Sequence, residues 1–266
     1  MPPRGWSVCD LRELWAYRHF LVMSVYRDLK VRYTQTVLGP FWAILQPLIQ
    51  MVIFSVIFGM FAAMPTNGVP YPMFYYSALV PWTFIATGLS MAIGSLHGNF
   101  TIVTKIYFPR MMLPIQGMLV GILDFCMSFV ILLGIALYFD YPPTLRVLLI
   151  PVFMIPMFLA AMGVGLLLSS LSVQFRDIRY LATHVVQLWM YLSPVLYPRD
   201  VLPARIQNWA ALNPAATMVD GSRWAFNAGT IAPPAFLAGS VGIALVLFMV
   251  GAIVFRRLER NLVDVL

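Results

Sequence analysis

The chain contains several long stretches without a single Asp, Glu, Lys or Arg, and these constrain its fold more than any other feature. Four of them cover residues 37–64, 69–96, 147–175 and 235–255. A helix needs about 20 apolar residues to cross a hydrocarbon core about 30 Å thick, so each stretch is long enough to span a membrane. Only 10% of the residues are charged, whereas soluble domains carry about 25%. An ordinary soluble globular protein is therefore excluded.

Two further stretches bring the expected number of spans to six. Residues 111–139 are apolar apart from Asp124, and residues 180–197 contain His184 as their one group that titrates near neutral pH. Continuous apolar runs of this kind do not match the short alternating segments of a membrane β-barrel. We therefore expect an all-α membrane protein. Its domain of residues 37–256 would hold spans at about 37–64, 69–96, 111–139, 147–173, 180–197 and 235–255, followed by a tail of residues 257–266.

The distribution of cationic residues indicates the orientation. Six spans place both termini on one side, and the positive-inside bias selects the cytoplasm for that side. In this topology 13 of the 17 Lys and Arg residues face the cytoplasm; the four outside are Arg146, Arg199, Arg205 and Arg223. Topology thus accounts for most of the net charge of +7, and nucleic-acid binding is not needed to explain it.

Residues 1–36 are expected to form a cytoplasmic region with an interfacial helix. Between Leu11 and Tyr33 most large apolar residues recur on one helical face, which is typical of a helix lying along a membrane surface. The Gly39-Pro40 pair would mark the bend into the first span.

Three cations crowd into the end of this helix, at Arg27, Lys30 and Arg32. Guanidinium groups match the geometry of phosphate oxygens, so the cluster is a candidate site for a substrate phosphate at the cytoplasmic entrance. The alternative is binding to the headgroups of anionic lipids.

Motifs for catalysis are absent from the sequence. It has no cluster of carboxylates for a metal and a diphosphate, no Cys and His pairs with metal-ligand spacing, no G-x-S-x-G and no Walker loop. If ATP drives this protein, the nucleotide must therefore bind another chain.

Asp124 is expected near the middle of its span, where an ionisable group suggests function. The alternative is that Asp124 packs against polar groups of a neighbouring helix. For His184, a position at the interface competes with a role in proton transfer.

Four stretches, in their order along the chain, suggest a family. They are R-D-L-K-V-R-Y-T-Q-T-V-L-G-P-F-W from Arg27, Y-S-A-L-V-P-W-T-F from Tyr76, I-V-T-K-I-Y-F-P-R-M-M-L-P from Ile102, and V-Q-F-R-D-I-R-Y from Val173. Together they resemble the membrane (permease) subunits of bacterial ABC exporters of O-antigen and capsule-type polysaccharides, and they are also similar to teichoic-acid exporters.

The resemblance implies a non-enzymatic permease of the bacterial inner membrane. Such a subunit forms a homodimer, pairs with two cytoplasmic ATPase subunits that hold ATP and Mg, and moves a polyprenyl-diphosphate-linked glycan into the periplasm. Two rival functions are an ABC exporter of drugs or small lipids and a membrane transferase acting on polyprenyl-linked sugars. The missing carboxylate cluster counts against the transferase.

The resemblance also assigns roles to particular residues. Channel-lining aromatic residues would be Phe41, Trp42, Phe54, Phe58, Trp189, Tyr191 and Tyr197. Contacts with the ATPase would come from Lys105, Tyr107, Arg110, Arg176, Asp177 and Arg179. The alternatives are that the aromatic residues anchor the chain at the membrane interface and that the cations only fix its topology.

Residues 198–234 are too broken for a span and too apolar for a free loop. Pro203 can open one short helix, and Asn213-Pro214 is a helix cap followed by Pro at the first helical position of another. Asn227-Ala228-Gly229 can end that second helix. We expect short re-entrant helices here, and the family resemblance makes them an outer gate. The alternative is a hairpin resting on lipid. The gate residues would be Trp209, Met218, Trp224 and Phe226.

Overall fold

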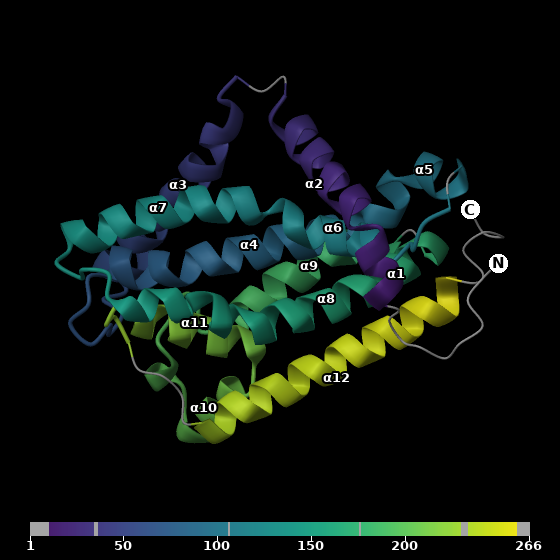
Figure 1. The fold of residues 1–266 in the computed structure, drawn as a ribbon. Helices are drawn as coiled ribbons and strands as arrows, with labels where there is room; N and C mark the ends of the chain where they lie inside the picture. The colour runs from purple at the N-terminus through teal and green to yellow at the C-terminus, as the bar shows by residue number, and fades with distance from the viewer. Residues whose placement is uncertain (1–10, 35–36, 106, 176, 230–233, 260–266) are drawn as a thin grey trace.

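A computed structural model of the protein describes residues 11–34, 37–105, 107–175, 177–229 and 234–259. Over these residues the regular structure is helical and contains no β-strand. The long helices α4, α7, α8 and α12 run alongside one another (Figure 1). Helices α2 and α3 both project from one side of this bundle and approach each other away from it (Figure 1). The expected all-α class is confirmed.

Five helical segments are long and apolar enough to cross a membrane. Their bounds are Gly39–Phe61, Tyr71–Gly98, Met112–Tyr138, Leu145–Gln174 and Phe236–Glu259. They contain η1 (Gly39–Phe41), α3 (Trp42–Phe54), the π-helical η2 (Ser55–Phe61), α4 (Tyr71–Gly98), α6 (Met112–Val120), α7 (Ile122–Tyr138), η3 (Leu145–Leu149), α8 (Ile150–Gln174) and α12 (Pro234–Glu259). Five of the six expected spans therefore appear close to their expected bounds.

The segment expected as the fifth span behaves differently. Helix α9 (Asp177–Tyr191) has 15 residues, which at 1.5 Å per residue is about 22 Å, short of the roughly 30 Å of a hydrocarbon core. After Tyr191 the chain leaves the helix in a series of turns that ends at Pro198. The described residues thus give five candidate spans, and a sixth crossing through α9 stays a prediction.

Helix α4 forms the centre of the bundle, with α6, α7, α8 and α11 packed around it. In the most apolar stretch of α4, 67% of the residues are buried, whereas in the most apolar stretch of the first span only 6% are buried. Tyr75, Tyr76 and Leu79 are completely enclosed. The first span therefore lies at the periphery of the protomer, and most of its surface faces lipid or another protein.

Two glycines allow α8 and α12 to touch backbone to backbone. A methyl group on Gly251 would lie 2.0 Å from the backbone oxygen of Gly163, and one on Gly163 would lie 2.3 Å from the backbone oxygen of Leu247. In lipid the hydrophobic effect does not drive helices together, so close packing of this kind carries much of their association.

A leucine at Gly251 is expected to destabilise the fold by about 3 kcal/mol or more, because the new side chain must push two backbones apart. Gly242 lies on the same helix, where an added methyl group meets nothing within 4 Å. The matched variant Gly242→Leu should therefore melt close to the unmodified protein. Thermal unfolding of both variants in detergent, followed by tryptophan fluorescence, measures the difference. Equal melting temperatures would contradict this account of the crossing.

The interfacial region forms two helices, because the helix expected from Leu11 to Tyr33 is interrupted at Tyr17. Its parts are α1 (Leu11–Ala16) and α2 (Arg18–Tyr33). Helix α2 packs against α6, and near its start the ring of Phe20 lies 4.7 Å from that of Phe108.

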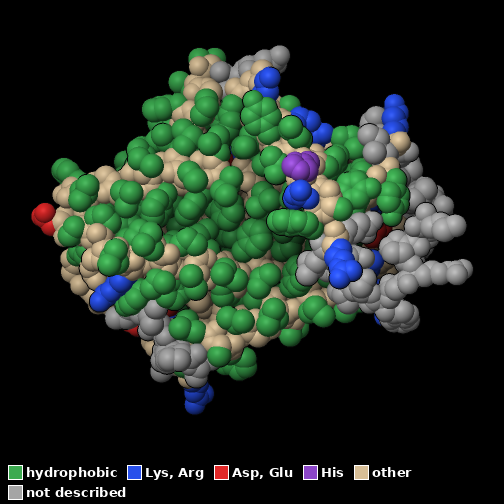
Figure 2. All heavy atoms as spheres, viewed as in Figure 1, with side chains coloured by type: hydrophobic (Ala, Val, Ile, Leu, Met, Phe, Trp, Pro, Cys, Tyr) green, Lys and Arg blue, Asp and Glu red, His purple; other side chains and the backbone are tan. Residues whose placement is uncertain are grey.

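Part of the expected apolar face points away from the bundle, since Trp15, Val22 and Tyr26 are more than 60% exposed, whereas Tyr33 on the same face bonds to Asp124 of α7. Helix α5 (Phe100–Lys105) and the last turn of α12 lie at the same end of the molecule (Figure 1). On the face shown in Figure 2, most Lys and Arg side chains also lie toward this end. The arrangement is that expected for the cytoplasmic end, whose orientation stays a prediction.

The region between α9 and α12 contains the short helices expected from its sequence. They are α10 (Ala204–Ala211), which begins after Pro203, and α11 (Pro214–Ala225); a further short helix, η4 (Arg199–Val201), was not predicted. The side chain of Asn213 accepts a hydrogen bond from the backbone N–H of Ala215, and Asn227 adopts a φ of 57° just beyond the end of α11. Both boundaries of α11 are therefore confirmed, while re-entry into the membrane stays a prediction.

Arg223 on α11 ties this region to the core. Its guanidinium group donates to the backbone oxygens of Phe74 (3.2 Å), Pro194 (2.7 Å) and Val195 (2.9 Å), and the side chain is buried. Burial lowers the pKa of Arg223 to about 9, so the group stays a cation at neutral pH. One cation thus satisfies carbonyls in the non-helical segment that follows α9.

Candidate functional site: two adjacent cavities beside the interfacial helix

Two cavities lie next to one another along α4. Cavity A, of about 400 Å³, lies between the end of α2 and helices α3, α4, α7 and α9. Cavity B, of about 770 Å³, lies between α2, α4, α6 and α9, closer to the end that carries α5. Arg32, Ala86 and Thr87 line both cavities. The two cavities therefore adjoin at these three residues.

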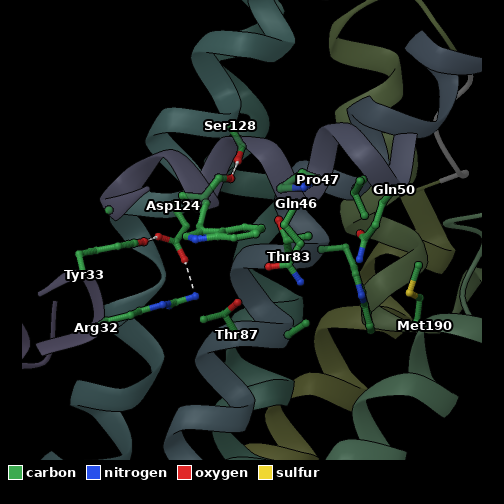
Figure 3. A pocket seen from close by; sticks show the side chains of 16 residues that line it. Arg32, Tyr33, Gln46, Pro47, Gln50, Thr83, Thr87, Asp124, Ser128 and Met190 are labelled. Atoms are coloured by element: carbon green, nitrogen blue, oxygen red, sulfur yellow. Dashed lines mark hydrogen bonds and ion pairs between the residues drawn. The ribbon is translucent and has the colours of Figure 1, made fainter. Parts of the chain in front are cut away.

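The wall of cavity A combines apolar and polar side chains, and most of the polar ones are uncharged. Helix α3 contributes Gln46 and Gln50, and α4 contributes Thr83 and Thr87 (Figure 3). Within each pair the residues are four apart, so they share one helical face. Amides and hydroxyls are unfavourable against lipid, and here they line a partly open cavity where they can bind a hydrogen-bonding ligand.

A charged group closes the end of cavity A that adjoins α2. The carboxylate of Asp124 on α7 lies 2.9 Å from a guanidinium nitrogen of Arg32, and it accepts a hydrogen bond from the hydroxyl of Tyr33 (Figure 3). Burial raises the pKa of Tyr33 above its usual value, and the bond to Asp124 raises it further. Tyr33 therefore remains a donor at neutral pH. The expectation that Asp124 packs against polar groups of a neighbouring helix agrees with these contacts.

In cavity B the two residues Arg27 and Asp28 of α2 bridge neighbouring helices. Arg27 donates to the side-chain oxygen of Asn99 at 2.6 Å and to the carboxylate of Asp28 at 2.8 Å. The other oxygen of Asp28 accepts from the side-chain amide of Gln116 on α6. The charge of Arg27 is therefore balanced within the protein.

The two cavities offer no site for a metal ion. No group of three or more His, Cys, Asp or Glu side chains suited to a metal occurs among the residues that the structure describes. What the site provides instead is a run of uncharged hydrogen-bonding groups, two tryptophans and two partly exposed arginines, Arg27 and Arg32. Trp42 and Trp82 line cavity A, and the side chain of Arg32 is 35% exposed.

Comparison with known proteins places the chain in a family. The model of the family described as ABC-2 type transporter matches residues 20–227, which include every helix that lines the two cavities. The chain belongs to the ABC-2 type transporter family.

Relatives within this ABC-2 transporter family resemble the chain along most of its length. The O-antigen export system permease protein RfbA of Myxococcus xanthus is 26% identical over 92% of this chain and 95% of that protein. The Klebsiella pneumoniae protein of the same name is 27% identical over 92% of this chain and 94% of that protein. The polysialic acid transport protein KpsM of Escherichia coli is 22% identical over 88% of this chain and 91% of that protein. The chain is accordingly the membrane subunit of a transporter.

Of the predicted phosphate site, the ABC-2 fold brings Arg27 and Arg32 to cavity B, and Arg32 also to cavity A. Lys30 is exposed and is not part of either lining. Both arginines have a carboxylate partner on the protein, at Asp28 and Asp124. Phosphate binding by this cluster stays a prediction, with Arg32 as the best-placed residue.

The predicted channel aromatics separate into different environments. Trp42 lines cavity A. Phe54 and Phe58 instead pack against Tyr75 and Tyr71 of α4. The others lie outside the two cavities: Phe41 and Tyr191 are 50% exposed, the indole N–H of Trp189 donates to Asn213, and the hydroxyl of Tyr197 donates to the backbone of Tyr191.

Of the residues predicted to contact the ATPase, Lys105, Tyr107, Arg110 and Asp177 lie at the end that carries α5. Lys105 and Tyr107 are exposed, and Asp177 begins α9. Arg110 donates to the backbone oxygen of Glu259 at 2.9 Å and so caps α12. Arg176 and the side chain of Arg179 lie outside the described residues.

The predicted outer gate divides into exposed and buried residues. Trp209 on α10 is 76% exposed, whereas Met218 and Phe226 are completely buried. Trp224 lies beneath Arg146, whose guanidinium carbon is 4.8 Å from the ring centroid. Met218 and Phe226 therefore contribute to packing, and gating by this region stays a prediction.

The polar side chains of cavity A were not predicted from the sequence. Their signal is present in the chain, because Gln46 and Gln50, like Thr83 and Thr87, are polar pairs four residues apart inside otherwise apolar spans. Pairs at this spacing place two polar groups on one face, which must turn away from lipid.

Proposed function

We propose that this chain is the permease of an ATP-driven exporter that moves a lipid-linked, O-antigen-like polysaccharide from the cytoplasm to the periplasm. It would act as a homodimer with two cytoplasmic ATPase subunits, which hold ATP and Mg, while this chain holds no cofactor. The observation that carries the proposal is the composition of cavity A. Sugars present hydroxyl groups and apolar C–H faces, which amides, threonines and tryptophans can bind without fixed charge.

The substrate would enter through cavity B. A polyprenyl diphosphate carries its charge where the lipid meets the sugar, and Arg32 lies at the junction of the two cavities. An arginine there can bind phosphate oxygens while the sugar chain extends into cavity A. The names of the RfbA and KpsM relatives, which concern export or transport of polysaccharides, support this substrate class.

Reconstitution tests the proposal. The chain is purified together with the ATPase encoded beside its gene, placed in liposomes, and supplied with polyprenyl-diphosphate glycan. ATP hydrolysis should change on addition of the glycan, and the glycan should cross the membrane. Stimulation by drugs or small lipids in place of glycan would favour the rival exporter. Failure to form a stable complex with any ATPase would refute the proposal.

Removing the two amides of cavity A is expected to weaken transport. Each net hydrogen bond contributes about 1 kcal/mol, so Gln46→Leu and Gln50→Leu should each lower glycan transport roughly fivefold. Ile49→Leu, on the same helix and outside the cavity lining, should have little effect. Initial rates of transport at equal amounts of assembled complex provide the measurement. Unchanged transport in the double variant would show that this wall does not contact the glycan.

A further inference from the structure

Asn99 connects the central helix to the segment expected to contact the ATPase. Its backbone N–H closes the end of α4, and its side-chain amide donates to the backbone oxygen of Ser95 at 2.9 Å. Its backbone oxygen accepts from Ile102 (3.0 Å) and Val103 (3.1 Å) in the first turn of α5. A displacement of α5 must therefore act on Asn99.

Arg27 and Asp28 on α2 form hydrogen bonds to residues that precede and follow α5 in the chain. Arg27 binds the side-chain oxygen of Asn99, before α5. Asp28 binds the amide of Gln116, which lies after α5 on α6. Arg27 and Asp28 also bind each other through both Nε (2.9 Å) and a terminal nitrogen (2.8 Å). We call these four residues (Arg27, Asp28, Asn99 and Gln116) the α2 clamp.

The far end of α2 carries the charge pair at the junction of the cavities. From Arg27 to Arg32 the helix advances five residues, about 7.5 Å, without a break. Arg32 then meets Asp124 on α7 at 2.9 Å. Helix α2 therefore connects the contact between Arg27 and Asn99 to the contact between Arg32 and Asp124.

We infer that the α2 clamp positions Arg32 according to the movement of α5. When the ATPase displaces α5, the clamp moves α2, and α2 changes the contact between Arg32 and Asp124 where the two cavities adjoin. The four clamp residues act as positioning residues, because they work through Arg32 rather than on the glycan. The inference rests on the proposed function, since it requires a motor that acts on α5.

Two substitutions at Asn99 isolate the contact. Asn99→Asp keeps an oxygen that can accept from Arg27, whereas Asn99→Leu has similar size and no acceptor. Both variants lose the bond from the Asn99 amide to Ser95, so their difference reports on the Arg27 contact. With the partner ATPase in liposomes, Asn99→Leu should lower the glycan moved per ATP hydrolysed by about tenfold. Asn99→Asp should stay close to the unmodified protein.

A second readout follows the movement of α2 directly. Tyr26 on α2 is 64% exposed, and a spin label at Tyr26→Cys, with Cys9 and Cys126 replaced by Ser, reports its surroundings. Nucleotide added to the complex should change the spectrum in the Asn99→Asp background and leave it unchanged in the Asn99→Leu background. A purely structural role would lower the melting temperature of Asn99→Leu and leave the nucleotide response intact.

The outcomes separate this inference from the proposed function. If the unmodified pair moves no glycan, the proposed function fails, whatever the variants do. If it moves glycan and the two Asn99 variants have equal ratios of transport to hydrolysis, the α2 clamp is overturned. The same holds if the spin label responds equally in both variants.

Discussion

Replacing Arg223 with Met is expected to lower the free energy of unfolding by about 4 kcal/mol, because an unsatisfied buried polar group costs about 1–3 kcal/mol. The guanidinium group donates to three backbone oxygens, and its carbon lies 3.6 Å from the centroid of the Phe74 ring. Methionine fills similar space and offers no donor. Buried backbone outside a helix stays folded only when its polar groups find hydrogen-bond partners.

Thermal unfolding in detergent measures this effect, with Arg205→Met as the control. Arg205 is exposed on α10, so the control substitution should change stability by less than about 0.5 kcal/mol. Arg223→Lys should be intermediate, because an ammonium group reaches fewer of the three oxygens. Equal melting of Arg223→Met and Arg205→Met would show that the carbonyls find other donors.

Arg32 and Asp124 form the charge pair where the cavities adjoin, and substitutions of these two residues should have opposite effects on the glycan. Arg32→Leu is expected to lower glycan transport by tenfold or more, since a charged hydrogen bond to phosphate contributes about 1.5–3 kcal/mol. Asp124→Asn keeps an oxygen that can accept from the Tyr33 hydroxyl and releases Arg32 from its carboxylate. This variant should therefore bind the lipid-linked glycan at lower concentration than the unmodified protein does.

Stimulation of ATP hydrolysis across a range of glycan concentrations checks both expectations. Arg32→Lys serves as the control for charge, because it keeps a cation without the paired geometry of the guanidinium group. Were Arg32 only a structural partner of Asp124, both single variants would lose activity and the double variant Arg32→Leu with Asp124→Leu would regain it. That pattern would rule out the phosphate role.

Local signals in the sequence predict much of this fold. The five long spans follow from uncharged runs, and the start of α11 follows from Asn213-Pro214, because membrane insertion and helix capping depend on residues close in the chain. The length of the apolar run gave a poorer prediction of the span at residues 180–197, because the run continues past Tyr191 while the helix ends there. Hydropathy measures composition, and it cannot show where the chain turns.

The candidate site was harder to predict, because its contacts join residues that are far apart in sequence. Asp124 was recognised as unusual within its span, but its partner Arg32 is 92 positions away and could be identified only from the structure. Arg223 was counted as an external loop charge, whereas the fold buries it. Charge alone does not distinguish a cation that sets topology from one that binds backbone oxygens inside the protein.

The sparse packing of the first span has a consequence for biogenesis. This segment emerges from the ribosome before α4 does, and the completed protomer buries only 6% of its most apolar stretch. The mean hydropathy of the first span, 2.0, exceeds the 1.5 of α4, so the first span can remain in the bilayer without packing against other helices. Helix α4, the least apolar of the five, depends on later-made neighbours. Co-translational insertion should therefore anchor the amino-terminal span early and complete the bundle only after α8 leaves the ribosome.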